Sequence, residues 1–292
     1  MFAERLAAVI DARVHRPRAI AEAAAARHRA LLFTGGGHDR LVLVAADHPA
    51  RGSLGAGRRP TAMADRADLL ERLCVALARP GVDGVLGTAD VLEDLLLLGA
   101  LDGKVVVGSM NRGGLSGSAF EIDDRFTGYG AEAIAAAGFD GGKMLLRIDP
   151  DDAATVSTME ACARAVDALA GRRLMAMVEP FVSRRVDGRS TNELTPDAMV
   201  RAISVASGLG GTSAYTWLKV PVVDDMERVM AASTLPALLL GGEVPADRDA
   251  AFEGWQKALR LPTVKGIVAG RSLLYPADDD VAGAVDTAVS LL

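Results

Sequence analysis

The sequence predicts a single (β/α)8 TIM barrel, an α/β fold, preceded by a short helical extension over residues 1–30. Eight apolar segments of strand length alternate with helix-like segments along the chain. These segments are apolar almost throughout, which is typical of parallel strands covered on both faces. No linker or low-complexity segment divides the 292 residues, so we expect one domain with the barrel core at residues 40–275. A doubly wound open sheet is the alternative, but eight evenly spaced units without a second domain favour closure.

The elements follow from local residue patterns. Residues 1–30 have helical spacing, and Pro17 separates two short helices. The segment Thr34–Asp39 contains three consecutive glycines and predicts a turn, because no helix follows it as a phosphate loop requires. The strands are expected at residues 41–46, 82–86, 105–108, 142–147, 174–179, 215–222, 236–243 and 264–271. The helices are expected at residues 62–78, 89–98, 130–137, 153–170, 196–207, 226–232, 248–259 and 280–292.

Composition limits the classes of partner. A net charge of −6 and a pI near 5.3 argue against nucleic-acid and anionic-membrane partners, which need a basic face. The N-terminus lacks a signal peptide, and no apolar run reaches membrane-spanning length. Cys74 and Cys162 have no metal-ligand spacing and are expected to be core thiols, which suits a reducing cytoplasm. We therefore expect a cytoplasmic protein, and an assembly of identical chains is compatible with the sequence.

One lysine stands inside an apolar strand. The run Tyr215–Val222 is aromatic, β-branched and apolar, and Lys219 lies within it. A buried ammonium is costly and tends to lose its proton, which creates an amine nucleophile near neutral pH. The alternative is a lysine that reaches solvent or an acidic partner. The chain has 32 Lys and Arg residues but only five lysines, so lysine is enriched at positions that need amine chemistry.

Charged residues also follow other predicted strands. In a (β/α)8 barrel the carboxyl ends of the strands form the active-site mouth. Asp47, Lys143, Glu179 and Lys219 are expected to converge there as two acids and two amines. A cation beside Lys219 favours its neutral amine, and the acids then move protons during covalent catalysis. The alternative is a set of buried ion pairs without catalytic function.

Glycines at the ends of the last two strands indicate a phosphate site. Gly241, Gly242 and Gly270 allow backbone amides to approach a phosphate closely, and Arg271 is a bidentate anion ligand. The alternative is tight turns that need glycine. Two further residues complete the predicted substrate-binding set, Arg147 on strand four and Ser109 on strand three.

The loops after the strands are rich in arginine. These side chains either bind a second anionic group or are solvated loop charges, and they are Arg51, Arg58, Arg59, Arg112, Arg184 and Arg185. Of the four histidines only His48 lies at a strand end, and a catalytic zinc site needs several His ligands there, so the sequence argues against one. No GxSxG motif supports a serine nucleophile. We therefore expect no metal and no other cofactor.

Six short segments resemble the class I aldolase superfamily of deoxyribose-phosphate, tagatose-1,6-bisphosphate and archaeal-type fructose-bisphosphate aldolases. The resemblance covers about residues 40–275. The segments are Val44–Pro49, Gly138–Lys143, Val178–Pro180, Trp217–Val220, Leu239–Glu243 and Val268–Arg271. Each segment alone is weak evidence for the resemblance, but six segments in the same order are specific for the superfamily. The tagatose-bisphosphate branch looks closest, whereas deoxyribose-phosphate aldolase has its second lysine on strand seven, where this chain has glycine and glutamate.

The resemblance implies a role for each charged residue. Lys219 is similar to the Schiff-base nucleophile, Glu179 to the acid/base, Lys143 to the amine that tunes it or binds substrate, and Asp47 to the proton-relay acid. The implied activity is cleavage or formation of a C–C bond in a phosphorylated ketose or keto-acid. Similar barrels accompany myo-inositol catabolism, where the substrate is 2-deoxy-5-keto-gluconate 6-phosphate. The alternatives are a non-covalent isomerase or decarboxylase, and a catalytically silent sugar-phosphate-binding barrel.

Overall fold

Eight parallel strands form a closed barrel in the computed structural model, which describes residues 2–30, 32, 40–242 and 248–292. The ring order is β1, β2, β3, β4, β5, β7, β8, β9, and β9 pairs with β1. The strands are β1 (Leu41–Ala45), β2 (Gly84–Gly87), β3 (Val105–Ser109), β4 (Gly141–Ile148), β5 (Met175–Val186), β7 (Thr216–Val220), β8 (Ala237–Leu240) and β9 (Val264–Ala269). The predicted (β/α)8 barrel is confirmed.

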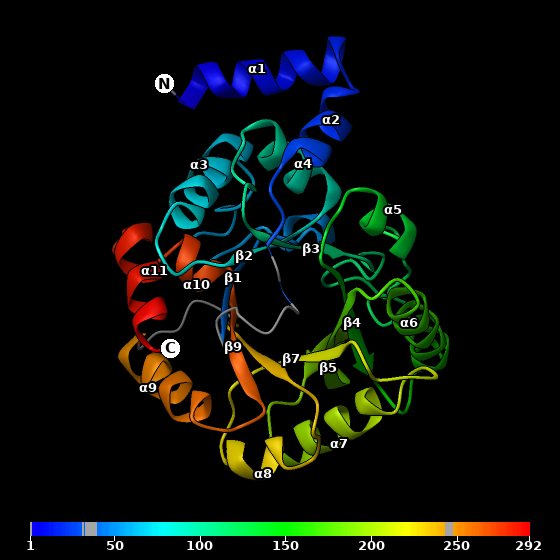
Figure 1. Cartoon of the computed structure of the whole chain (residues 1–292). Coiled ribbons are helices and arrows are strands. Elements are labelled where there is room, and N and C mark those ends of the chain that lie inside the picture. Colours follow the sequence, from blue (N-terminus) through cyan, green and yellow to red (C-terminus); the bar gives the residue numbers. More distant parts are fainter. Residues whose placement is uncertain (1, 31, 33–39, 243–247) are drawn as a thin grey trace.

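Helices surround the barrel and cover the outer faces of its strands (Figure 1). The outer helices are α3 (Arg66–Leu77), α4 (Ala89–Leu97), α5 (Ala131–Ala136), α6 (Ala154–Ala170), α7 (Pro196–Ser207), α8 (Met226–Met230), α9 (Arg248–Leu259), α10 (Arg271–Leu274) and α11 (Val281–Ser290). The bounds of α7 and α9 agree with the predicted ones. The Thr195 side chain caps α7 by accepting a hydrogen bond from the Ala198 amide, and Pro196 occupies the first turn.

The helix predicted from residue 62 begins later. The Asp65 carboxylate accepts hydrogen bonds from the Ala67 and Asp68 amides at 2.8 and 3.1 Å, so α3 begins at Arg66. A capping aspartate stabilises a helix start because it pairs amides that have no partner in the first turn.

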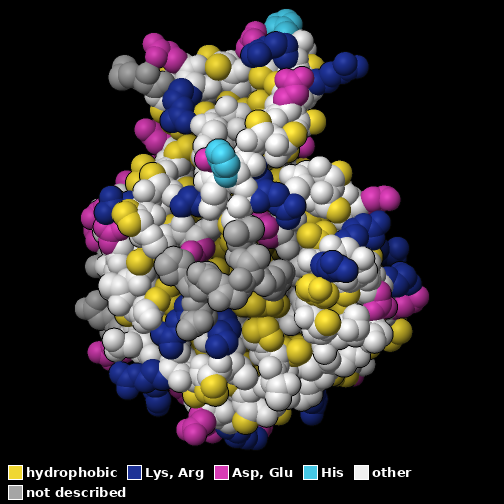
Figure 2. Space-filling model, viewed as in Figure 1, with side chains coloured by type: hydrophobic (Ala, Val, Ile, Leu, Met, Phe, Trp, Pro, Cys, Tyr) yellow, Lys and Arg dark blue, Asp and Glu magenta, His cyan; other side chains and the backbone are white. Residues whose placement is uncertain are grey.

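The predicted N-terminal extension is present as two helices that project from the barrel (Figures 1 and 2). They are α1 (Phe2–His15) and α2 (Ala19–Ala26), with Pro17 between them. Lys, Arg, Asp and Glu side chains are interspersed over the visible surface in Figure 2. The glycine-rich turn predicted at residues 34–39 and Glu243 lie outside the described residues.

Alternation along each strand separates two apolar layers. On β1, Leu41, Leu43 and Ala45 belong to the cluster inside the barrel, whereas Val42 and Val44 pack with the surrounding helices. This is the period of two that strand geometry imposes. The inward positions are apolar at the amino ends of the strands and become charged toward the carboxyl ends.

One hairpin extends beyond the barrel and was missed by the sequence analysis. Strand β5 continues past Glu179 to Val186 and pairs in antiparallel fashion with β6 (Arg189–Asn192). The turn residues Asp187 and Gly188 both have positive φ, 50° and 77°. The Asp-Gly dipeptide is a known hairpin signal, so this sequence feature could have predicted the turn.

Candidate functional site

A cavity of about 1140 Å³ opens at the carboxyl ends of the strands. Its polar residues come from separate strand ends, as expected for this fold. Of the predicted site residues, the cavity is lined by Asp47, Lys143, Arg147, Glu179, Lys219, Gly241, Gly242, Gly270 and Arg271. The structure therefore brings together nine of the ten.

The alternation of strand side chains explains why these residues face the cavity. Lys143 and Arg147 are four residues apart on β4 and thus share its inner face. Trp217 and Lys219 are two apart on β7, and Trp217 packs against the cluster inside the barrel. Lys219 therefore also faces inward, one pleat nearer the mouth.

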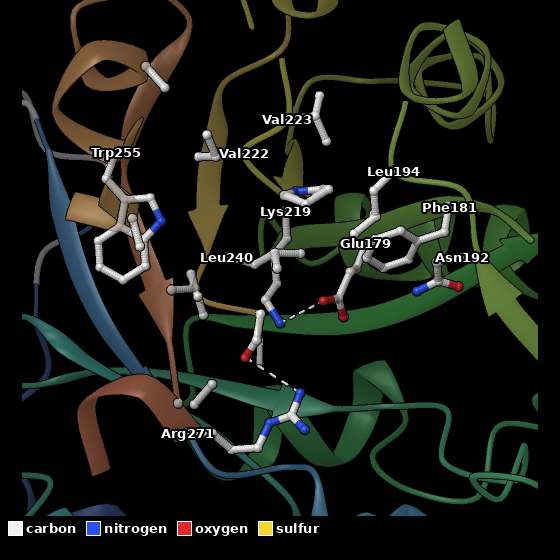
Figure 3. Close-up of a pocket in the computed structure, with 18 of the residues that line it drawn as sticks. Glu179, Phe181, Asn192, Leu194, Lys219, Val222, Val223, Leu240, Trp255 and Arg271 are labelled. Atoms are coloured by element: carbon white, nitrogen blue, oxygen red, sulfur yellow. Dashed lines mark hydrogen bonds and ion pairs between the residues drawn. The ribbon is translucent and has the colours of Figure 1, made fainter. Parts of the chain in front are cut away.

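The Glu179 carboxylate contacts both lysines. Its Oε1 lies 2.9 Å from the Lys219 Nζ, and its Oε2 forms an ion pair with the Lys143 Nζ (Figure 3 draws the Lys219 contact). All three side chains are buried. Two amines and one carboxylate thus form a continuous chain of proton donors and acceptors at the base of the cavity.

Asp47 extends this chain beyond Lys143. Its Oδ2 is 3.2 Å from the Lys143 Nζ and 3.1 Å from the Arg112 Nη1, and the Ser109 hydroxyl donates to it at 3.0 Å. Ser109 is fully buried under Asp47 and is not among the residues that line the cavity. Ser109 therefore contacts Asp47 and does not line the cavity, where a contact with substrate was expected.

The charges in this cluster shift one another's pKa values. Burial alone would raise the pKa of both carboxyl groups. Arg112 and Lys143 outweigh this effect at Asp47, and Lys143 and Lys219 outweigh it at Glu179, so both pKa values fall below their usual range. Burial, assisted by the Arg112 charge, lowers the pKa of Lys143 to about 8. At neutral pH both acids are ionised, and Lys143 titrates close to the working range of an enzyme.

His48 lies beside the same cluster. Its Nδ1 is 3.8 Å from the Asp47 Oδ1, and its ring lines the cavity. Burial is the main cause that lowers the pKa of His48 to about 3, so the imidazole is neutral. Within the described residues, no group of three or more His, Cys, Asp or Glu side chains is placed to hold a metal ion.

The glycine-rich corner lies at the ends of β8 and β9. A Cβ on Gly270 would lie 2.3 Å from the Ala45 carbonyl oxygen, and one on Gly241 would lie 2.7 Å from the Ser272 Oγ. Gly242 has φ of +63°, and its carbonyl oxygen accepts a hydrogen bond from the Arg271 Nη2 at 3.5 Å (Figure 3). Close packing thus requires glycine at Gly241 and Gly270, and the Arg271 guanidinium lies beside Gly242.

Arg147 occupies a different environment from the one expected of a phosphate ligand. Its Nη2 is 3.0 Å from the Glu121 Oε1, and its Nη1 is 4.0 Å from the Asp124 Oδ2. Arg51 also pairs with Glu121, at 2.7 Å. The positive charges of Arg51 and Arg147 are balanced by the negative charges of Glu121 and Asp124. Arg147 therefore lines the cavity with its charge already neutralised.

Several of the loop arginines have acidic partners. Arg59 pairs with Asp279, Arg184 with Glu193 and Arg185 with Asp152. Arg112 differs from them, because it is buried beside Asp47. Sequence reasoning placed it among the loop charges and could not identify this contact, which joins segments 65 residues apart.

Apolar side chains form the walls above the polar base (Figure 3). Phe181 and Leu194 come from β5 and from the segment that follows the hairpin, and Trp255 comes from α9 on the opposite side of the view. Apolar walls lower the local dielectric constant and strengthen electrostatic interactions at the base.

The described part of the chain contains no helix with the length and hydrophobicity of a membrane span. Comparison with curated proteins finds no match. Solved structures share the barrel at low sequence identity. One is described as a Schiff-base-forming fructose-1,6-bisphosphate aldolase, with TM-score 0.63 and 18% identity over 87% of this chain and 94% of that one. Another is an archaeal fructose-1,6-bisphosphate aldolase with its catalytic Lys covalently bound to a carbinolamine intermediate. It gives TM-score 0.65 and 17% identity over 93% of this chain and 98% of that one.

A much stronger match is the crystal structure of Cgl0159 from Corynebacterium glutamicum. The TM-score is 0.95, and 51% of residues are identical over 99% of this chain and 96% of that one. The Cgl0159-like family model matches residues 39–289. The chain therefore belongs to the Cgl0159-like family.

Proposed function

We propose that this protein is a class I aldolase that acts on a phosphorylated ketose or keto-acid through a Schiff base on Lys219. The observation that carries the proposal is the pair of buried amines on one carboxylate, Lys219 and Lys143 on Glu179, at the base of a cavity with a glycine-arginine corner. Covalent amine catalysis needs a lysine that can lose its proton in a site shielded from water.

The first step is formation of the imine. The neutral Lys219 amine attacks the substrate carbonyl carbon, and the proton that the nitrogen releases passes to Glu179. Lys143, in its ammonium form, protonates the alkoxide oxygen of the adduct, which gives the carbinolamine. Glu179 contacts both amines, so it can pass the first proton to Lys143. Lys143 then protonates the carbinolamine hydroxyl, which leaves as water, and the iminium forms on Lys219.

The second step breaks the C–C bond. A carboxylate removes the proton of the substrate hydroxyl on the carbon that becomes the aldehyde. The bond electrons move into the iminium, the aldehyde leaves and an enamine remains on Lys219. Protonation of the enamine carbon and addition of water then release the ketone and regenerate the lysine. Asp47 or Glu179 serves as the base, since both are ionised at neutral pH.

The corner of Gly241, Gly242, Gly270 and Arg271 would hold the phosphate. Backbone amides can approach an anion closely where no Cβ intervenes, and a guanidinium binds phosphate oxygens in pairs. The fold shared with proteins described as Schiff-base aldolases supports the reaction class. Within this class, 2-deoxy-5-keto-gluconate 6-phosphate is our candidate substrate.

Two alternatives make different predictions. A non-covalent isomerase or decarboxylase would use the same acids and amines for proton transfer without a covalent adduct. A catalytically silent sugar-phosphate-binding barrel would keep the phosphate corner and show no turnover.

The test is borohydride trapping, followed by intact-mass analysis and peptide mapping. The protein is incubated with dihydroxyacetone phosphate and a panel of phosphorylated ketoses and keto-acids. We expect a reduced adduct on Lys219 that is absent in Lys219→Ala and unchanged in Lys257→Ala, a control lysine that also lines the cavity. An adduct on Lys143 would instead identify that residue as the nucleophile, in keeping with the burial that lowers its pKa to about 8. No adduct with any ligand, together with thermal stabilisation by those ligands, would refute the aldolase proposal.

A further inference from the structure

Arg112 is a third basic side chain in the buried cluster. The amines contact both carboxylates, Lys143 at Asp47 and Lys219 at Glu179. With Lys219 neutral, as the proposed first step requires, Lys143 and Arg112 balance the two acids. The nearby arginines do not change this balance, because Arg51 and Arg147 are balanced by two acids of their own.

The guanidinium is also rigidly held. Its Nε donates to the Asn111 carbonyl oxygen at 2.5 Å, and its Nη1 faces the Asp47 Oδ2 at 3.1 Å. The Asn111 side chain is itself fixed by hydrogen bonds of 2.6 and 2.7 Å to the backbone of Leu145. These contacts occupy two of the three guanidinium nitrogens and orient the third.

That third nitrogen, Nη2, is buried and has no hydrogen-bond partner among the residues that the structure describes. Arg112 is about 5% exposed, and it lines the cavity. Asp47 compensates the charge of the guanidinium, but the Nη2 donor is left unpaired, which is unfavourable for a buried polar group. An anionic ligand in the cavity would supply an acceptor for this donor.

The position of Arg112 in the barrel separates it from the phosphate corner. Arg112 follows β3, and Gly241 and Gly242 follow β8. In the closed ring β3 and β8 are four places apart in either direction, and the Arg112 guanidinium extends from the end of β3 toward Asp47 at the end of β1. A ligand with its phosphate at β8 and β9 can present its other end to Arg112, while its middle lies over the lysines.

We propose that Arg112 binds a second anionic group of the substrate, a carboxylate or a phosphate at the end remote from the phosphate corner. The inference rests on the proposed function for the position of the first phosphate. It deepens that function by assigning the substrate to compounds with an anion at both ends, and Arg112 becomes the residue that selects them.

Equilibrium binding to two matched ligands tests the inference without any chemistry on Lys219. 6-Phosphogluconate and glucitol 6-phosphate differ at one end, where the first has a carboxylate and the second a hydroxymethyl group. By calorimetry we expect the protein to bind 6-phosphogluconate about tenfold or more tightly than glucitol 6-phosphate, the effect of one buried charge-assisted pair. A third ligand, glucitol 1,6-bisphosphate, has a phosphate at both ends. If the protein prefers only this ligand over glucitol 6-phosphate, the second anionic group is a phosphate.

The variant Arg112→Met should reduce this preference to less than about twofold, and Arg112→Lys, which keeps the charge beside Asp47, should reduce it in part. Arg164→Met, at an exposed arginine of α6, is the matched control and should keep the preference. Equal weakening of both ligands in Arg112→Met and in Arg112→Lys would overturn the inference, because it would mean that Arg112 acts only through Asp47. So would the absence of any preference in the unmodified protein. Neither result depends on borohydride trapping, so this inference and the aldolase proposal can fail separately.

Discussion

Lys143 and Lys219 share one carboxylate, since the two oxygens of Glu179 each contact one of the amines. The lysines stand on β4 and β7, which are separated by β5, the strand that carries Glu179. This arrangement offers a path for a proton from one amine to the other without solvent.

Glu179→Gln keeps the shape of the side chain but removes its charge and its capacity to accept a proton. If Glu179 transfers protons between the lysines, kcat should fall by about 10²–10⁴-fold, the usual effect of losing a general acid–base. Steady-state kinetics on the substrate identified by trapping measures this change. A kcat within threefold of the unmodified protein would exclude the proton-transfer function.

The pKa of Lys143, lowered by burial to about 8, predicts the pH dependence of turnover. Lys143 donates a proton in the proposed mechanism, so only its charged form is active. Activity should therefore decrease as the pH rises through about 8. In Lys143→Arg the guanidinium does not titrate in this range, so the decrease should disappear at lower overall activity. The measurement is kcat/KM from pH 6 to pH 10, which reports groups of the free enzyme, and an unchanged basic limb in the variant would assign the titration to another group.

Arg147→Met tests whether Arg147 stabilises the fold or binds phosphate. Its pairing with Glu121 and Asp124 predicts a loss of about 3–5 kcal/mol in the free energy of unfolding, as for removal of one partner from a buried ion pair. Urea unfolding measures this loss, and Arg147→Lys should lose less. Phosphate-ligand affinity should change less than in Arg271→Met. A greater loss of affinity in Arg147→Met would show that Arg147 binds the phosphate, as the sequence analysis expected.

Two alanine substitutions distinguish the effect of close packing, at Gly270, from the effect of backbone strain, at Gly242. A Cβ on Gly270 would collide with the Ala45 carbonyl, two residues before Asp47, so both stability and kcat should fall. A Cβ on Gly242 would make only an ordinary contact, 3.9 Å from the Leu240 Cδ1, but φ is +63°, so alanine there should cost about 1 kcal/mol of stability. Because Gly242 belongs to the proposed phosphate site, this variant should raise KM and lose less kcat than Gly270→Ala. Thermal unfolding and kinetics on both variants provide the comparison, and equal kcat losses would contradict it.

Much of the barrel could be predicted from local patterns alone. The apolar strands and the helices between them have bounds close to the predicted ones, because strand and helix periods are local properties of the chain. The late start of α3 at Arg66 and the hairpin at Asp187-Gly188 had local signals too, the capping residue Asp65 and a turn dipeptide. Both features could therefore have been predicted from the sequence, and the sequence analysis overlooked them.

The sequence by itself determined that Asp47, Lys143, Glu179 and Lys219 would meet, because parallel strands of a barrel bring their carboxyl ends to one mouth. Only the tertiary structure decided how their charges are distributed. The burial of Arg112 against Asp47, the support of Asp47 by Ser109 and the neutralisation of Arg147 by Glu121 join segments that are 26 to 65 residues apart. Such contacts depend on the register between strands and on the path of the loop after β3, and neither is encoded in the period of any single segment.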